Sequence, residues 1–164
     1  MKKKIAVGAV LITLLLVGGG LWYTRPQSFW AVTGMDRAAI TGASGIVIES
    51  FYENGTPEQQ VWEIDGLTPG QEGYEALLGL LEGSTYRAHL SNLTAPFSDS
   101  QPGSERWVQL SFAADGELFS VQIPVSQTMT IPIPDSYGYL RYDASNPQFQ
   151  GELFQYIQAN GEKL

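Results

Sequence analysis

The feature that most constrains this 164-residue chain is an uncharged, apolar run near its N-terminus, residues 5–23. Three lysines precede the run at positions 2–4, and Arg25 follows it. Nineteen helical residues rise about 29 Å, close to the roughly 30 Å hydrocarbon core of a bilayer. Lysines before the run predict that the N-terminus stays in the cytoplasm. We therefore expect residues 1–25 to be a transmembrane helix or signal anchor, with the remaining chain on the extracytoplasmic side of the cell membrane.

The same run has a second interpretation, as a cleaved secretory signal. Residues 5–17 have the length of a signal h-region, and three glycines at 18–20 supply small residues for a signal peptidase, with cleavage after Gly20. Against cleavage, the apolar character resumes at Leu21, and Trp22 and Tyr23 lie where an interfacial aromatic belt is expected. We favour the retained anchor and keep a secreted domain as the alternative.

The rest of the chain is strongly acidic. The chain has 9 Lys and Arg and 17 Asp and Glu, a net charge of -8. Four of the basic residues and none of the acidic ones lie within residues 1–25, so the outer part has five bases against seventeen acids, or −12. This charge disfavours nucleic acid as a partner, because phosphate binding needs Lys and Arg. The chain also has no cysteine, hence no disulfide, which is typical of a Gram-positive surface.

Two hairpins are expected beyond a juxtamembrane linker at 26–37, which would lead into a first strand around 29–32. The first hairpin pairs 46–52 with 60–64 around Asn54-Gly55, after a flexible loop at 42–45. Pro57 in the connection favours a loop longer than two residues. The second hairpin has alternating apolar residues over 108–114 and 119–125 on either side of Asp115-Gly116.

The remaining segments predict two helices and three further strands. Residues 71–83 and 146–161 have the apolar spacing of amphipathic helices, whereas 86–93, 129–134 and 137–142 are extended. Pro132 and Pro134 would confine the second extended segment to an edge or a bulge. The predicted fold class is α+β: an N-terminal transmembrane helix, then residues 38–164 as an antiparallel sheet of hairpins with two amphipathic helices packed on it. The hairpin connections imply helices on one face of this sheet.

Catalytic chemistry has little support in the sequence. The single histidine, His89, is expected on a strand, and no serine stands in a nucleophile elbow. One histidine and no cysteine cannot complete a zinc site. We expect no catalytic residue, no metal and no cofactor. A carboxylate pair of the glycosidase kind remains open among the seventeen acids.

Aromatic residues are the remaining candidate signal for binding. Trp107 is expected on the strand face opposite Val108, and Tyr137 and Tyr139 share a face of the last strand. An exposed aromatic row on a sheet could bind a glycan, a peptide or a partner domain. The competing interpretation, which we favour, is that each helix covers one face of the sheet.

The outer domain resembles a group of Firmicutes membrane-anchored or lipoprotein-like extracytoplasmic domains of unknown function. The resemblance lies in residues 74–81, 107–112 with Asp115-Gly116, 137–142 and 149–157, and it covers roughly residues 38 to 160. It implies a surface location and no known activity. We expect a non-enzymatic binding module with a protein, peptide or cell-wall partner. The alternatives are a cell-wall hydrolase with a carboxylate pair and an accessory subunit of an envelope complex.

Overall fold

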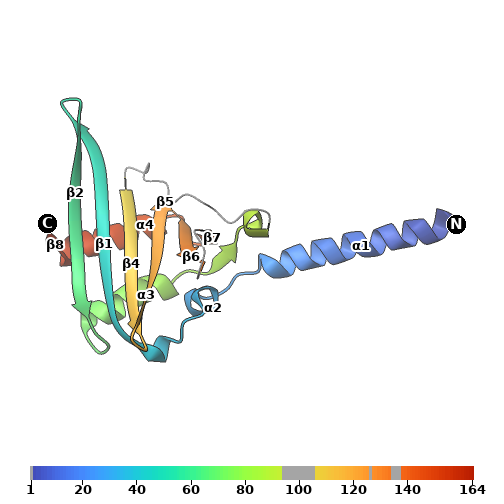
Figure 1. Ribbon diagram of the computed structural model, residues 1–164, viewed down its shortest axis with the longest axis horizontal. Coiled ribbons are helices and arrows are strands. Elements are labelled where there is room, and N and C mark those ends of the chain that lie inside the picture. The colour runs from blue at the N-terminus through green and yellow to red at the C-terminus, as the bar shows by residue number, and fades with distance from the viewer. Residues whose placement is uncertain (1, 94–105, 126, 134–137) are drawn as a thin grey trace.

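One antiparallel sheet with helices on a single face forms the domain, and a long helix projects away from it (Figure 1). The computed structural model describes residues 2–93, 106–125, 127–133 and 138–164, with side chains from residue 12 onward except that of Val125. The fold is α+β, as the hairpin pattern predicts. Its elements in chain order are α1 (Lys2–Tyr23), α2 (Phe29–Thr33), η1 (Arg37–Ala39), β1 (Ile40–Glu53), β2 (Thr56–Leu67), α3 (Glu72–Glu82), β3 (Tyr86–Ala88), η2 (Leu90–Leu93), β4 (Arg106–Ala114), β5 (Glu117–Val125), β6 (Thr128–Pro132), β7 (Tyr139–Ala144), α4 (Phe149–Asn160) and β8 (Glu162–Lys163).

The eight strands lie in the order β3-β7-β6-β5-β4-β1-β2-β8, each antiparallel to its neighbours. Both predicted turn pairs are confirmed, with positive φ at Asn54, Gly55, Asp115 and Gly116. The expectation of a longer loop at Pro57 is wrong. Glu53 pairs with Thr56, so the loop has two residues, and Pro57 lies in β2 beyond the part that β8 covers. On that edge its missing N–H costs no ladder bond.

Three further expectations about the strands need correction. Residues 42–45 lie inside β1, not in a loop, and Gly45 makes room for α4: a Cβ there would lie 2.7 Å from Ile157 Cδ1. Residues 29–32 are helical, because Ser28 caps α2 and Gly34 ends it with φ 72°. β6 lies between β5 and β7 and not at an edge, with the irregular pairing at Pro124 of β5.

Both amphipathic helices pack on the same face of the sheet. The predicted apolar stripe of α3 is fully or nearly fully buried, and it joins one core with α4 and the inward strand residues. Tyr156 of α4 donates a hydrogen bond of 2.6 Å to the carbonyl of Gly73 in the first turn of α3. The expectation that one helix covers each face is therefore wrong. The sheet residues that point into this shared core include Val47, Leu110, Phe112, Val121 and Ile123.

The helix α1 carries its apolar side chains in the open. Leu15 is 75% exposed and Leu16 is 72% exposed. Among the residues whose side chains the structure describes, no helix is both long and apolar enough to qualify as a membrane-crossing segment.

The segment between α1 and β1 is built into the domain. Only three residues separate the end of α1 from Gln27. Gln27 forms a bridge with β3, since its N–H donates to the carbonyl of Tyr86 at 2.9 Å and its carbonyl accepts from Tyr86 N–H at 2.8 Å. Phe29 then enters the core with 0% exposure, its ring against those of Tyr86 and Phe112. Residues 27–33, expected as part of a linker, thus supply both a bridge and a core residue.

Replacing Phe29 with alanine should therefore destabilise the whole domain. A buried phenylalanine truncated to alanine typically costs about 3–5 kcal/mol of unfolding free energy. Denaturant unfolding of the full chain in mild detergent measures this loss. Tyr52→Ala, at a strand end where the side chain is 79% exposed, is the aromatic control and should change stability by less than about 0.5 kcal/mol. Equal effects of the two substitutions would contradict a structural role for this segment.

Candidate functional site

The face of the sheet opposite the helices is the broadest candidate surface. Side chains on this open face alternate along each strand with the buried ones, so Ile46 and Ile48 of β1 flank the buried Val47. Trp107 of β4 likewise stands opposite the buried Val108, as the sequence predicts. In the part of the chain that the structure describes, no helix lies over this face, since α3 and α4 share the other one.

An apolar row crosses one part of the open face. Ile48 pairs with Val61 of β2 on one side and with Trp107 of β4 on the other. Paired residues in adjacent antiparallel strands have Cβ atoms about 5 Å apart, so these three side chains adjoin. All three are partly exposed. Sequence reasoning missed Ile48 and Val61, although their alternation with Val47 and Trp62 was visible in the sequence.

A second row, two residues along the strands, is polar and mostly uncharged. Gln109 pairs with Gln122, and Gln122 pairs with Thr130. Next to it, the hydroxyls of Ser111 and Ser120 lie 2.9 Å apart. Gln122 Oε1 is buried and has no hydrogen-bond partner in the described part of the chain, whereas Gln109 beside it is partly exposed and can exchange hydrogen bonds with a bound molecule. The ends of the polar row are charged: Glu63 of β2 pairs with Ile46 of β1, and Arg141 of β7 pairs with Thr130 of β6.

The aromatic candidates do not form one row. Trp107 and Tyr139 are both partly exposed on the open face. Tyr139 is placed there because it pairs with Pro132, whose side chain points to the opposite side from that of the buried Ile131. β5 and β6 lie between their strands, which at a spacing of about 4.8 Å puts their backbones roughly 14 Å apart across the sheet. Tyr137 lies outside the described residues.

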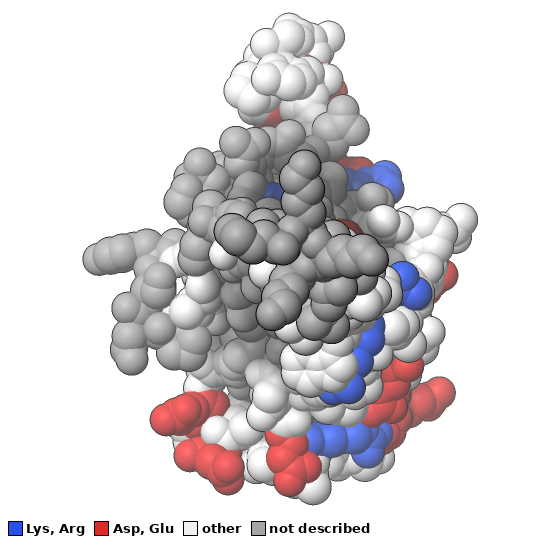
Figure 2. Space-filling model, turned by 90° about the vertical axis from the view of Figure 1, so that its right-hand side faces the viewer, with Lys and Arg blue, Asp and Glu red and all other residues white. Residues whose placement is uncertain are grey.

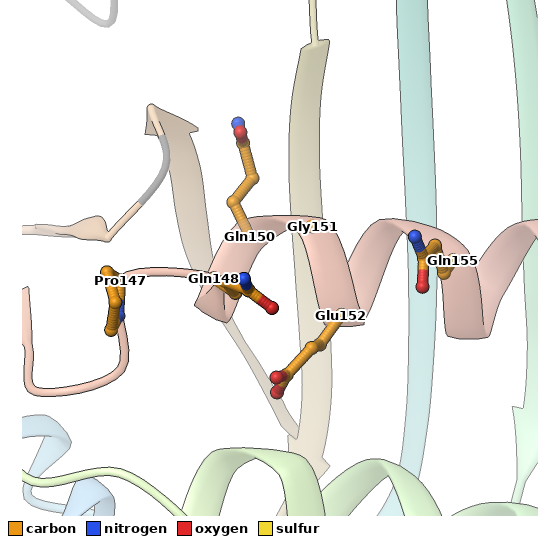
Figure 3. Close-up of a pocket in the computed structure, with 6 residues that line it drawn as sticks. All are labelled: Pro147, Gln148, Gln150, Gly151, Glu152 and Gln155. Atoms are coloured by element: carbon orange, nitrogen blue, oxygen red, sulfur yellow. The ribbon is translucent and has the colours of Figure 1, made fainter.

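A hollow of about 390 Å³ lies at the start of α4 (Figure 3). Figure 3 shows the Gln150 side chain pointing away from those of Gln148 and Glu152. Gln150 is buried, and its Nε2 donates to the carbonyls of Arg106 and Ile123 at 3.0 and 2.9 Å. Glu152 accepts from Asn146 Nδ2 at 2.8 Å. The polar groups of the hollow therefore serve the packing of α4. Among the described residues that line it, Glu152 is the one carboxylate, and Pro147, Gly151 and Gln155 complete this lining.

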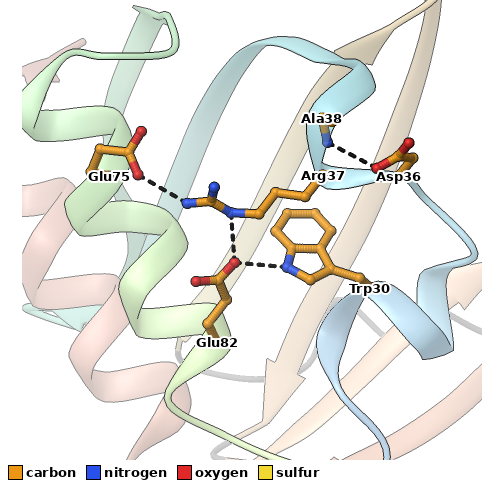
Figure 4. Close-up of polar contacts among 6 residues, drawn as sticks. All are labelled: Trp30, Asp36, Arg37, Ala38, Glu75 and Glu82. Atoms are coloured by element: carbon orange, nitrogen blue, oxygen red, sulfur yellow. Dashed lines mark hydrogen bonds and ion pairs between the residues drawn. The ribbon is translucent and has the colours of Figure 1, made fainter.

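A charged cluster ties the segment after α1 to α3 (Figure 4). Arg37 donates from Nε to Glu82 at 2.7 Å and from Nη2 to Glu75 at 2.9 Å. Trp30 Nε1 donates to the same oxygen of Glu82 at 2.7 Å. The Glu82 carboxylate, and then that of Glu75, raise the pKa of Arg37. Figure 4 shows the guanidinium between the two carboxylates, so these acids are bridged by an arginine, unlike a glycosidase pair facing a sugar.

His89 lies just beyond β3 and forms a local contact with Ser91. His89 Nδ1 lies 2.7 Å from Ser91 Oγ and accepts from Ser91 N–H at 3.2 Å. A hydroxyl and an imidazole at this distance resemble a nucleophile and its base. The backbone N–H bonds the same nitrogen, however, so the contact also closes a turn between residues two apart. The expectation that His89 stands on a strand is wrong by one residue.

Metal binding gains nothing from the described residues: nowhere among them do three or more His, Asp or Glu gather closely enough to hold an ion. Comparisons with known proteins returned no matching family model, no matching curated protein and no matching solved structure.

The Arg37 cluster should make the stability of the domain depend on salt. Its charged groups are well exposed, and exposed ion pairs are screened by added salt. Arg37→Gln is expected to lower Tm at low salt, with a loss that shrinks as NaCl is added. Arg87→Gln, the same charge change at an exposed residue of β3, is the control and should change Tm less. A loss independent of salt would show that the arginine acts through packing alone.

Proposed function

We propose that this chain is a single-pass membrane protein whose extracytoplasmic domain is a non-enzymatic binding module at a Gram-positive cell surface. The observation that carries the anchor is the exposed apolar surface of α1, which projects from the domain (Figure 1). Apolar surface in water costs about 25 cal/mol per Å², and a bilayer would cover it. The apolar run at 5–23 is long enough to span the bilayer, and part of this run precedes the residues whose side chains the structure describes.

The end of α1 has the chemistry of a membrane interface. The Arg25 guanidinium lies 4.8 Å from the centre of the Trp22 ring, and Trp22 is largely exposed. Aromatic rings and arginines at the end of an apolar helix are typical of the headgroup level. Retention of the anchor therefore agrees with these contacts better than cleavage after Gly20, which would leave Trp22 on the mature domain without a cover.

The open face supports a binding role. It combines a partly exposed tryptophan and two aliphatic neighbours with neutral amides and hydroxyls. Aromatic residues are enriched and most charged residues depleted at the centres of protein interfaces. The partner we propose is a protein, peptide or cell-wall component that lays an apolar group on the row of Ile48, Val61 and Trp107 and hydrogen-bonds to the neighbouring Gln109.

Leu14→Arg tests the anchor. A charge at the centre of a spanning helix costs about 2.5–3.5 kcal/mol on the insertion scale, so the variant should leave the membrane pellet after carbonate extraction of a Gram-positive host. Leu14→Ile is the matched control and should stay in the pellet at full size. A wild-type chain found in the medium and shortened at Gly20 would instead establish a secreted domain.

Trp107→Ala tests the binding face. A photo-crosslinking residue at Gln109 on the open face is expected to form a discrete adduct in intact cells, and one at the exposed Gln155 on α4 should not. Removing a central interface tryptophan typically costs about 2 kcal/mol, roughly thirtyfold in Kd, so Trp107→Ala should abolish the Gln109 adduct. The same adducts at both positions, or one indifferent to Trp107→Ala, would count against this face.

A further inference from the structure

We propose that η2 rests on the headgroup layer of the membrane in which α1 is embedded, as a second contact with anionic phospholipid. This inference rests on the anchor proposed above. The surface consists of η2 with its two leucines, Leu90 and Leu93, the preceding Arg87 of β3, and the end of α1 at Trp22 and Arg25.

The pairing of Gln27 with β3 brings η2 level with the end of α1. The bridge between Gln27 and Tyr86 is antiparallel, so the chain running back from Gln27 to Arg25 lies beside the chain running forward from Tyr86 to Ala88. η2 follows β3 at once and therefore continues toward the last turn of α1. In Figure 1, η2 lies at the end of the domain nearest α1.

The proximity of the end of α1 to β7 supports the same placement. The pKa of Tyr142 is raised, first by burial and second by the nearby Tyr23 hydroxyl. Tyr142 pairs with Ala88, the last residue of β3. The last residue of α1 therefore lies near the end of β3, which His89 separates from η2.

The two leucines of η2 are apolar side chains that are largely exposed. Leu90 is 56% exposed and Leu93 is 62% exposed. They lie on a turn held in place by β7: Asn92 Nδ2 donates to the carbonyl of Arg141 at 2.8 Å, and Arg141 N–H donates to Asn92 Oδ1 at 3.0 Å. A fixed turn that presents two leucines beside the interfacial Trp22 suits partial burial among headgroups and upper acyl chains.

The charges of this end of the domain differ from those of the rest. Residues 21–27 and 86–93 include Arg25, Arg87 and His89 and no acid, in a chain with 17 Asp and Glu. The acid paired with Arg87 is Asp143, and its carboxylate accepts a hydrogen bond from Thr128 Oγ1. Figure 2, which faces this end, shows Lys and Arg along its right-hand side, several of them beside acids, and further acids along the lower margin. Arginines near an anionic surface are attracted to it, whereas the −12 domain as a whole is repelled.

These features favour a lipid surface over a protein as the occupant. Anything that covers η2 must also lie level with Trp22 and Arg25, and for an embedded α1 that level is the bilayer surface. The two contacts together would hold the domain in one orientation on the membrane.

Single cysteines placed in this cysteine-free chain measure the contact directly. The full chain is reconstituted in vesicles of phosphatidylcholine and phosphatidylglycerol, and an environment-sensitive fluorophore is attached to Leu93→Cys. Nitroxide-labelled lipid should quench this probe several-fold more strongly than a probe at Leu118→Cys. Leu118 is a matched leucine, 73% exposed, beside the β4–β5 turn. Arg87→Gln should reduce the quenching at Leu93→Cys in these vesicles and leave it unchanged in phosphatidylcholine alone.

A probe at Val17→Cys separates failure of the anchor from failure of this contact. Strong quenching at Val17→Cys with equal, weak quenching at Leu93→Cys and Leu118→Cys overturns the contact and leaves the anchor standing. Weak quenching at all three positions overturns both. Quenching at Leu93→Cys that does not respond to Arg87→Gln overturns the role of anionic lipid.

Discussion

Tyr86 is the residue on which the arrangement of the molecule depends. Its backbone pairs with Gln27 on one side and Ala144 of β7 on the other. Its hydroxyl donates to the carbonyl of Leu81 in α3 at 2.8 Å, and its ring packs edge-on against Phe29 and Phe149. Burial raises the pKa of this hydroxyl far above its usual value. One residue, through its backbone and its side chain, therefore joins the segment after α1, both core helices and the edge of the sheet.

The strand order turns this junction into an orientation. α1 leaves the domain beside β3, the first strand in the order, whereas β2 and β8 form the far edge (Figure 1). If α1 is embedded, the strands lie at increasing distance from the bilayer in this order, and the open face points along the membrane plane instead of toward the membrane. A partner could then reach the row of Ile48, Val61 and Trp107 without competing with lipid, because lipid would meet only the β3 end and η2. The proposed membrane contact and the proposed binding face thus use different sides of one sheet.

Local sequence patterns predicted an element correctly where one face of the segment packs into the core. The stripe of Tyr74, Leu77, Leu78 and Leu81 placed α3 to within a residue, and Asp115-Gly116 placed the β4–β5 turn. Prediction failed where the identity of a residue is explained by a contact with a residue far away in the sequence. The glycines at 42–45 indicated a loop, but Gly45 is small because Ile157 of α4 packs against it. Trp107 was placed on the correct face, but its neighbours Ile48 and Val61 come from strands whose register only the folded sheet defines.

The sequence by itself determined the apolar N-terminal run, the charge contrast with the outer part, the α+β class and both turn pairs, because each depends on residues close together in the chain. The sequence left open whether both helices share one face, and the tertiary structure decided this and showed that residues 27–33 complete the core. It also brought η2 level with the end of α1. The physical reason is that an amphipathic pattern shows that one side of an element must be buried. Which other element covers that side depends on pairing between residues far apart in the sequence, and in this chain on Tyr86.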